Sequence, residues 1–169
     1  MTTCVLVGIP GAGKSTIGRE LAKRLAVSFI DTDREIERIA GKTVAQIFIE
    51  DGEAKFREIE KQAVLDALKT ENTVVSLGGG SVMDAAVREK LTQHQTIWLQ
   101  TSIATALKRT SMNQNRPLLL DAPRATLIKL LEQRAGFYQE VSTKSIDTDN
   151  RSVKEIVEEL ALSLTEVKS

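Results

Sequence analysis

Short apolar runs alternate with longer amphipathic stretches along the 169 residues of this chain. The apolar runs predict β-strands near residues 3–7, 27–31, 73–77, 95–100 and 144–147, and the stretches between them have helical spacing. Such alternation favours an α/β fold, a parallel sheet with helices on both faces and right-handed crossovers. Ligands bind beyond the carboxyl ends of the strands in such sheets, so functional residues are expected just after each apolar run.

The composition is that of an ordinary soluble globular protein, with 41% hydrophobic and 27% charged residues. Without an internal repeat or a linker, residues 1–169 are expected to form a single domain. The formal net charge is zero, so no overall field favours nucleic acid or an anionic membrane as a partner. No apolar run approaches the roughly 20 residues that span a bilayer, and the first predicted strand leaves no room for a targeting peptide. We therefore expect a cytoplasmic protein, and we take a monomer as the expected state without a sequence feature that decides it.

The first predicted strand runs directly into Gly8-Ile9-Pro10-Gly11-Ala12-Gly13-Lys14-Ser15-Thr16, which fits the phosphate-binding pattern G-x-x-x-x-G-K-[ST]. Glycines permit a tight loop whose backbone N–H groups meet several phosphate oxygens at once. Lys14 brings a positive charge to the β- and γ-phosphates, and the Ser15 hydroxyl offers a hard oxygen to Mg²⁺. The following amphipathic stretch predicts a helix that points its positive N-terminal end at the phosphates. The strand, the glycine-rich loop and the helix together therefore predict binding of a nucleoside triphosphate.

Two acidic residues, Asp31 and Asp33, follow the second predicted strand. They would point the same way if the chain is still extended there. Carboxylates beside a phosphate site can help to hold Mg²⁺, accept the proton of a substrate hydroxyl, or cap the next helix. Because Asp33 precedes Arg34 and Glu35, a plausible first helical turn, capping by Asp33 is the structural alternative to a role in the site.

Arg57 lies on a predicted helix that is otherwise rich in acidic residues. Its guanidinium either pairs in solvent with Glu53 or Glu60, both within helical reach, or grips a carboxylate or phosphate at two points. The residues themselves leave both interpretations open.

Gly78, Gly79 and Gly80 directly follow the third predicted strand. Most turns need only one glycine. Three in a row favour a ligand that approaches exposed backbone N–H groups closely.

A polar, proline-flanked segment near residues 111–123 predicts a flap that carries Arg116. Such a flap would close over the γ-phosphate and neutralise charge in the transition state, whereas an ordinary surface loop is the alternative. The helix predicted after it places Arg134 and Tyr138 one turn apart.

Taken together, these motifs resemble the shikimate kinase family. The resemblance rests on residues 11–16, Asp31-Thr32-Asp33, the block from Gly41 to Glu60 with Arg57, the three glycines, Arg116-Pro117-Leu118-Leu119, and Arg134 with Tyr138. It covers nearly the whole chain. It implies a five-stranded P-loop fold like that of nucleoside monophosphate kinases, with a substrate-binding region near residues 33–60 and a lid near 111–123. The implied reaction transfers the γ-phosphoryl group of ATP to the 3-hydroxyl of shikimate, with Mg²⁺ as cofactor.

The resemblance also implies a role for each matching residue. The implied ATP-binding residues are Gly11, Ala12, Gly13, Lys14, Ser15, Thr16, Arg109, Arg116 and Arg151, with Arg109 and Arg151 flanking the adenine. The implied shikimate-binding residues are Asp33 at the ring hydroxyls, Arg57 and Arg134 at the carboxylate, and Gly78, Gly79 and Gly80. Ser15 and, through water, Asp31 would hold Mg²⁺. The implied catalytic residues are Lys14, Asp33 and Arg116.

Three other functions fit parts of the pattern. A gluconate kinase resembles this chain but has His-Pro after the acidic pair, where Arg34 and Glu35 stand here. A nucleoside monophosphate kinase needs stacking surfaces for a base, and only 4% of the residues are aromatic. A GTP-dependent switch normally carries Asn-Lys-x-Asp, which this sequence lacks. Shikimate phosphorylation is therefore the function that the sequence favours.

Overall fold

A computed structural model of the protein describes residues 4–111 and 122–168. The strands are β1 (Cys4–Val7), β2 (Ser28–Asp31), β3 (Thr73–Ser76), β4 (Thr96–Gln100) and β5 (Lys144–Asp147). The α-helices are α1 (Lys14–Leu25), α2 (Thr32–Ala40), α3 (Val44–Glu50), α4 (Glu53–Ala67), α5 (Ala85–Leu91), α6 (Ile103–Ser111), α7 (Pro123–Val141) and α8 (Val153–Lys168). A short 3₁₀ helix, η1, covers Ser81–Met83.

The five strands form one parallel sheet in the order β2-β3-β1-β4-β5. Val5 of the central strand β1 lies opposite Val75 of β3 and Thr96 of β4. β1 and β3 are buried along their whole length, which explains why β1 is a continuous apolar run and why neither strand alternates between apolar and polar residues. The predicted parallel α/β sheet is confirmed, and each strand agrees with its predicted range to within one residue at either end.

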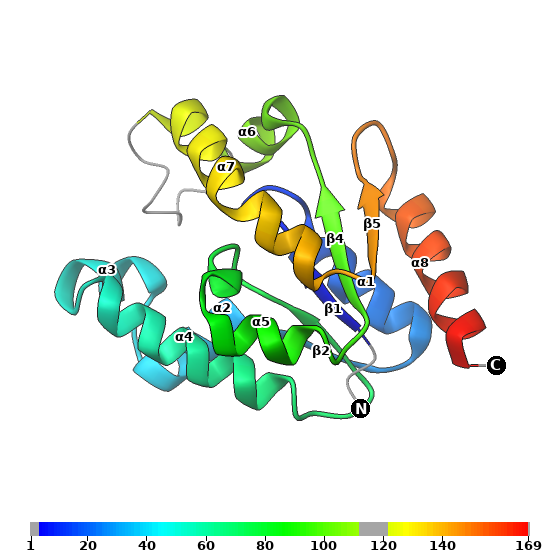
Figure 1. Ribbon diagram of the computed structural model, residues 1–169, viewed down its shortest axis with the longest axis horizontal. Coiled ribbons are helices and arrows are strands. Elements are labelled where there is room, and N and C mark those ends of the chain that lie inside the picture. The colour runs from blue at the N-terminus through cyan, green and yellow to red at the C-terminus, as the bar shows by residue number, and fades with distance from the viewer. Residues whose placement is uncertain (1–3, 112–121, 169) are drawn as a thin grey trace.

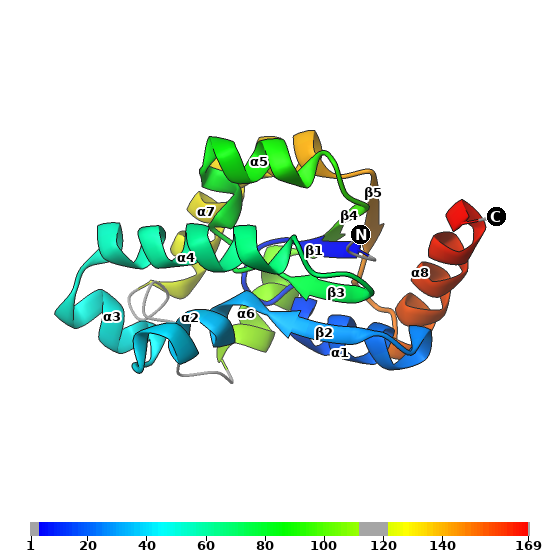
Figure 2. The same cartoon turned by 90° about the horizontal axis from the view of Figure 1, so that it is seen from below.

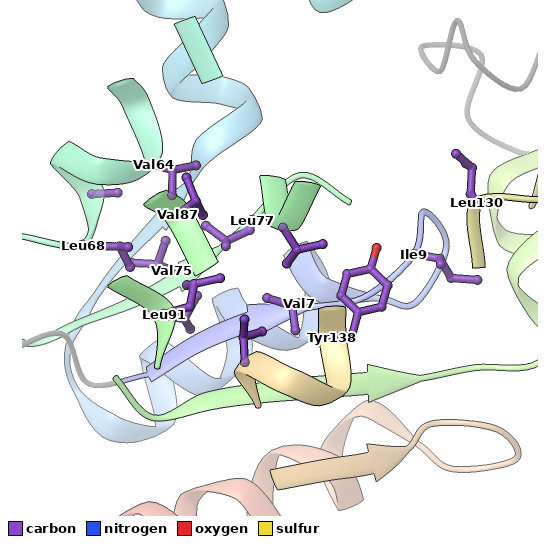
Figure 3. Close-up of a cluster of buried hydrophobic side chains, with 14 of the residues drawn as sticks. Val7, Ile9, Val64, Leu68, Val75, Leu77, Val87, Leu91, Leu130 and Tyr138 are labelled. Carbon is purple, nitrogen blue, oxygen red and sulfur yellow. The ribbon is translucent and has the colours of Figure 1, made fainter. Parts of the chain in front are cut away.

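Helices cover both faces of this sheet (Figure 1; Figure 2). On one face α1 and α8 pack over the strands, where Leu21 and Leu160 share one buried cluster with Leu6 of β1. On the other face α4, α5 and α7 enclose a second cluster (Figure 3), in which Val7 packs with Tyr138 and other side chains of these helices. None of the described helices is both long enough and apolar enough to cross a membrane.

The segment from α2 to the first half of α4 projects to one side of the sheet (Figure 1). It has a small apolar cluster of its own, in which Ile36, Ile47 and Phe56 are buried. The rings of Phe48 and Phe56 lie 4.6 Å apart within it. The predicted substrate-binding region, residues 33–60, therefore lies within a lobe beside the carboxyl end of β2.

Candidate active site

The phosphate loop connects β1 to α1 beyond the carboxyl end of the central strand. Gly11 and Gly13 have φ angles of +87° and +90°, which strain any other residue. A Cβ on Gly11 would also lie 2.6 Å from the Ala106 carbonyl oxygen of α6. Lys14 begins α1 and is only 8% exposed, and its Nζ donates to the carbonyl oxygens of Gly8 at 2.7 Å and Ile9 at 3.0 Å. The loop therefore encloses a buried ammonium at the N-terminal end of α1.

Asp31 ends β2 and acts as the N-cap of α2. Its Oδ1 accepts the Asp33 N–H at 3.0 Å, and its Oδ2 accepts the Ser15 hydroxyl at 2.8 Å. The structural alternative, in which Asp33 caps this helix, is excluded, because α2 begins at Thr32 and Asp33 already lies in its first turn. For the same reason the chain is not extended through Asp33. The two carboxylates line one cavity because the helix turns Asp33 toward it, not because of strand alternation.

A cavity of about 600 Å³ lies between the phosphate loop and the projecting lobe. The predicted residues of the loop line it, except Ala12, whose side chain is fully buried. Asp31, Asp33, Arg57, Arg109 and Arg134 also line it, as do the glycine run (residues 78–80) and the ring of Phe48. The structure thus gathers into one cavity residues that are far apart in the sequence.

Each residue of the glycine run lies against a different charged side chain. A Cβ on Gly78 would lie 2.6 Å from Asp33 Oδ1, and one on Gly79 would lie 3.1 Å from Arg134 Nη1. A Cβ on Gly80 would lie 2.6 Å from Arg57 Nη2. None of these three glycines has a positive φ angle, so the backbone conformation does not require glycine at these positions. A side chain at Gly78 or Gly80 would therefore displace a charged group of the site, and one at Gly79 would crowd Arg134.

Arg57 reconciles the two interpretations that its sequence left open. Its Nη1 lies 2.7 Å from Glu60 Oε1 and its Nη2 3.6 Å from Glu53 Oε1, and the side chain still lines the cavity. Glu60 is only 4% exposed. Burial raises the pKa of the Glu60 carboxyl, and the neighbouring Arg57 charge lowers it by less. The ion pair with Glu60 therefore fixes the guanidinium at the cavity wall.

Arg134 reaches the same cavity from α7 and is only 4% exposed. Among the described residues its Nε has no hydrogen-bond partner. A buried guanidinium N–H without an acceptor is costly, and an anionic ligand in the cavity would remove that cost. One turn further on, the Tyr138 hydroxyl donates to the Gly79 carbonyl at 2.6 Å.

The three remaining predicted arginines differ in position. Arg109 of α6 donates from Nη1 to the Gly11 carbonyl at 3.0 Å, so it lies directly against the phosphate loop. Arg151 is not among the residues that line the cavity, and its Nη2 lies 2.6 Å from Glu159 Oε2 on α8. Arg116 and most of the predicted lid lie outside the described residues, so the lid stays a prediction.

Four residues of the site, Phe48, Phe56, Thr32 and Glu60, have no role in it that the sequence predicts. Phe48 and Phe56 line the cavity, although their spacing indicated only packed helices. Thr32 is fully buried and bonds to the glycine run, and its position between two aspartates gave no signal. Glu60 was considered only as a solvated partner of Arg57. Its position three residues after Arg57 was the signal for the pair, but nothing local indicated burial.

The fold and the cavity together define a P-loop kinase of small molecules: a lysine-bearing phosphate loop, an aspartate and two arginines line one cavity. The sequence profile of the shikimate kinase family matches residues 10–165. A shikimate kinase from Thermobifida fusca is 46% identical over 160 residues, which cover 95% of this chain and 93% of that protein. The chain belongs to the shikimate kinase family.

Solved structures agree with this assignment. The shikimate kinase from Acinetobacter baumannii, determined in complex with shikimate, has a TM-score of 0.91 and 35% identity. The match covers 98% of this chain and 95% of that one. A gluconokinase from Sinorhizobium meliloti has a TM-score of 0.58 and 20% identity, with 98% and 93% coverage. That second likeness shows a shared fold and does not favour gluconate as the acceptor.

Proposed function

We propose that the protein transfers the γ-phosphoryl group of ATP to the 3-hydroxyl of shikimate, giving shikimate 3-phosphate and ADP. The observation that carries the proposal is one cavity that is lined by the phosphate loop and by Asp33, Arg57 and Arg134. Such a site suits an acceptor that has both a hydroxyl and a carboxylate. The Acinetobacter baumannii relative, which has shikimate bound, supports this choice of acceptor.

Arg57 and Arg134 would hold the carboxylate of the acceptor. A guanidinium binds a carboxylate through two parallel N–H···O bonds, which fix its orientation as well as its position. Both arginines stand against the glycine run, so their guanidinium groups are confined before the acceptor arrives. Such confinement lowers the entropy lost on binding.

Asp33 would hold the 3-hydroxyl. Phosphoryl transfer needs positioning and charge neutralisation more than covalent chemistry. A carboxylate that only orients the attacking hydroxyl would therefore supply much of the rate acceleration that Asp33 contributes. A carboxylate that holds this hydroxyl would also be able to take its proton as the O–P bond forms. Lys14 would neutralise charge on the β- and γ-phosphates from within the loop.

Ser15 and Asp31 fit the binding of Mg²⁺. A hydroxyl and a carboxylate lie 2.8 Å apart at the edge of the phosphate loop, and Mg²⁺ prefers hard oxygen ligands. Few protein ligands are needed, because Mg²⁺ usually keeps waters and binds phosphate oxygens of the nucleotide. When bound, the ion supplies positive charge that stabilises the transferring phosphoryl group.

Several further expectations belong to this proposal. Arg116 would approach the phosphates from the lid, and Arg109 and Arg151 would flank the adenine. For Arg151 this requires the guanidinium to reach the nucleotide from its present ion pair with Glu159. The single domain, the monomeric state and the cytoplasmic location also stay predictions from the sequence.

The first test is acceptor specificity. Purified protein with ATP and Mg²⁺ should release ADP rapidly with shikimate, and only at the background hydrolysis rate with gluconate or with a nucleoside monophosphate. A coupled ADP assay measures all three acceptors under one condition. Faster ADP release with gluconate or with a nucleoside monophosphate than with shikimate would contradict the proposed function.

Replacing Arg57 by lysine tests the carboxylate clamp. Lysine keeps the charge but cannot form two parallel hydrogen bonds, so the KM for shikimate should rise about 10- to 100-fold, the equivalent of one lost charged hydrogen bond. The KM for ATP should stay unchanged. Arg38→Lys is the matched control, because Arg38 pairs with Glu35 on the exposed surface of α2. Unchanged shikimate kinetics in the Arg57 variant would exclude a two-point clamp there.

A further inference from the structure

Two buried hydroxyl groups, from two different helices, hold the glycine run. Thr32 at the start of α2 is fully buried, and its Oγ1 accepts the Gly78 N–H at 3.2 Å and donates to the Ser76 carbonyl at 3.3 Å. Tyr138 of α7 is also fully buried and donates to the Gly79 carbonyl at 2.6 Å. The roles proposed above for ATP, Mg²⁺ and shikimate use neither hydroxyl.

Other hydrogen bonds within the run decide which of its N–H groups stay available. The Ser81 N–H donates to the Gly78 carbonyl, and the Met83 N–H donates to the Gly80 carbonyl, each at 3.1 Å. In a trans peptide the carbonyl and the following N–H point in opposite directions. The Gly79 N–H therefore points away from the Ser81 N–H, and the Gly80 N–H points away from the Tyr138 hydroxyl. Within the described part of the chain, neither N–H has a hydrogen-bond partner.

We propose that Thr32 and Tyr138 are positioning residues for the acceptor, because their hydroxyls orient the glycine run so that the Gly79 and Gly80 N–H groups face it. Both glycines line the cavity, so the two N–H groups are within the site that the acceptor would occupy. This inference rests on the proposed function, since it requires an acceptor whose oxygen atoms can accept these hydrogen bonds.

The surroundings of Tyr138 suit a fixed donor. Its ring lies in the buried cluster of Figure 3 and 5.8 Å from the ring of Trp98, so the phenol has little freedom to move. Burial raises the pKa of the phenol to about 12, more than the nearby Arg134 charge lowers it, so the hydroxyl keeps its proton at neutral pH. Because Arg134 and Tyr138 are one turn apart on α7, this helix would place both the carboxylate clamp and the glycine run.

A purely structural role for the two hydroxyls predicts a different result. Loss of any buried hydrogen bond lowers stability, but only a positioning role alters acceptor binding selectively. Thr96 provides the matched control: it is fully buried, and its Oγ1 donates to the Leu91 carbonyl at 2.9 Å at the amino end of β4, away from the site. Thr96→Val and Thr32→Val therefore remove comparable hydroxyls from different places.

The kinetic test compares Tyr138→Phe, Thr32→Val, Thr32→Ser and Thr96→Val with the wild type. In Tyr138→Phe and Thr32→Val we expect the KM for shikimate to rise roughly 3- to 20-fold, the effect of one neutral hydrogen bond, while kcat and the KM for ATP change by less than about twofold. Thr32→Ser keeps the hydroxyl and should restore the wild-type KM, and Thr96→Val should leave it unchanged. An unchanged shikimate KM in both variants, or an equal rise in Thr96→Val, would overturn the proposal.

A spectroscopic test observes the two N–H groups directly. Of the ten glycines, only Gly79 and Gly80 follow another glycine. Protein labelled with [1-¹³C,¹⁵N]glycine therefore gives only these two signals in an HNCO spectrum, which requires a labelled carbonyl before a labelled nitrogen. Both signals should move when shikimate is added to the wild type. In Tyr138→Phe they should start at different positions and need more shikimate to reach saturation. Signals that do not move in the wild type would overturn the inference.

The outcomes separate this inference from the proposed function. If the wild type does not phosphorylate shikimate, the proposed function itself is wrong. If turnover is normal but the two glycine signals and the shikimate KM values do not respond, only the positioning role is wrong. Should Tyr138→Phe fail to fold, as judged by circular dichroism, the comparison of Thr32→Val with Thr32→Ser decides the question alone.

Discussion

Replacing Lys14 by alanine should lower kcat by roughly 10²- to 10³-fold or more, which is the usual cost of removing one preorganised group that stabilises transition-state charge. The ammonium is buried inside the phosphate loop and held by two of its carbonyl oxygens, so its position is fixed before the nucleotide binds. The fold should survive, because Gly11 and Gly13 set the shape of the loop independently of the lysine. Steady-state kinetics and thermal unfolding measure the two effects separately.

Lys23→Ala on the same helix is the matched control. Lys23 is an exposed residue of α1 that pairs with Glu20 at 3.0 Å, so its loss should leave turnover unchanged. Turnover that survives in Lys14→Ala would remove the assignment of the phosphate loop. Equal losses in both variants would indicate a general effect of charge on the protein instead.

Asp33→Asn should lower kcat by roughly 10²- to 10⁴-fold if the carboxylate takes the proton of the acceptor hydroxyl. Asparagine has nearly the same shape and can still accept a hydrogen bond, so it tests the proton transfer more than the position of the hydroxyl. The pH profile of kcat separates the two roles. A general base must be ionised, so turnover of the wild type should fall in acid, and the variant should lack that fall.

Asp84→Asn is a suitable control for this second variant. Asp84 also lies beyond β3, but it caps α5 and is absent from the lining of the site cavity. Asparagine is an equally good N-cap, so the control should keep wild-type kinetics. A small loss of kcat in Asp33→Asn with an unchanged pH profile would assign Asp33 to orienting the hydroxyl alone.

The fold could be predicted from the sequence because its signals are local. A strand buried on both faces is a continuous apolar run, and an amphipathic helix repeats every turn, so neither requires knowledge of distant residues. The phosphate loop is also local, since Gly11, Gly13 and Lys14 are neighbours whose spacing already describes the site. The strands, the helices around the sheet and the position of the phosphate loop were predicted correctly because each depends on residues that are close in the sequence.

Burial and long-range contacts could not be predicted in the same way. The sequence places Glu60 three residues after Arg57, but only the packing of α4 beside the glycine run makes that pair a buried one at the cavity wall. The sequence did not decide which aspartate caps α2, because Asp31 and Asp33 are equally good caps in isolation, and the structure assigns the cap to Asp31. Asp31 also accepts a hydrogen bond from Ser15, which lies 16 residues earlier in the chain. A contact over that distance in sequence leaves no local pattern from which it could be predicted.

By itself the sequence therefore determined the sheet, the phosphate loop and the types of charged residue that the site would use. Only the tertiary structure decided which of these residues meet. It also shows that a Cβ on any residue of the glycine run would crowd one charged side chain of the site, that of Asp33, Arg134 or Arg57. The physical reason is that backbone propensity acts between neighbours in the chain, whereas this cavity is formed by side chains from α2, α4 and α7 that come together only when the core packs.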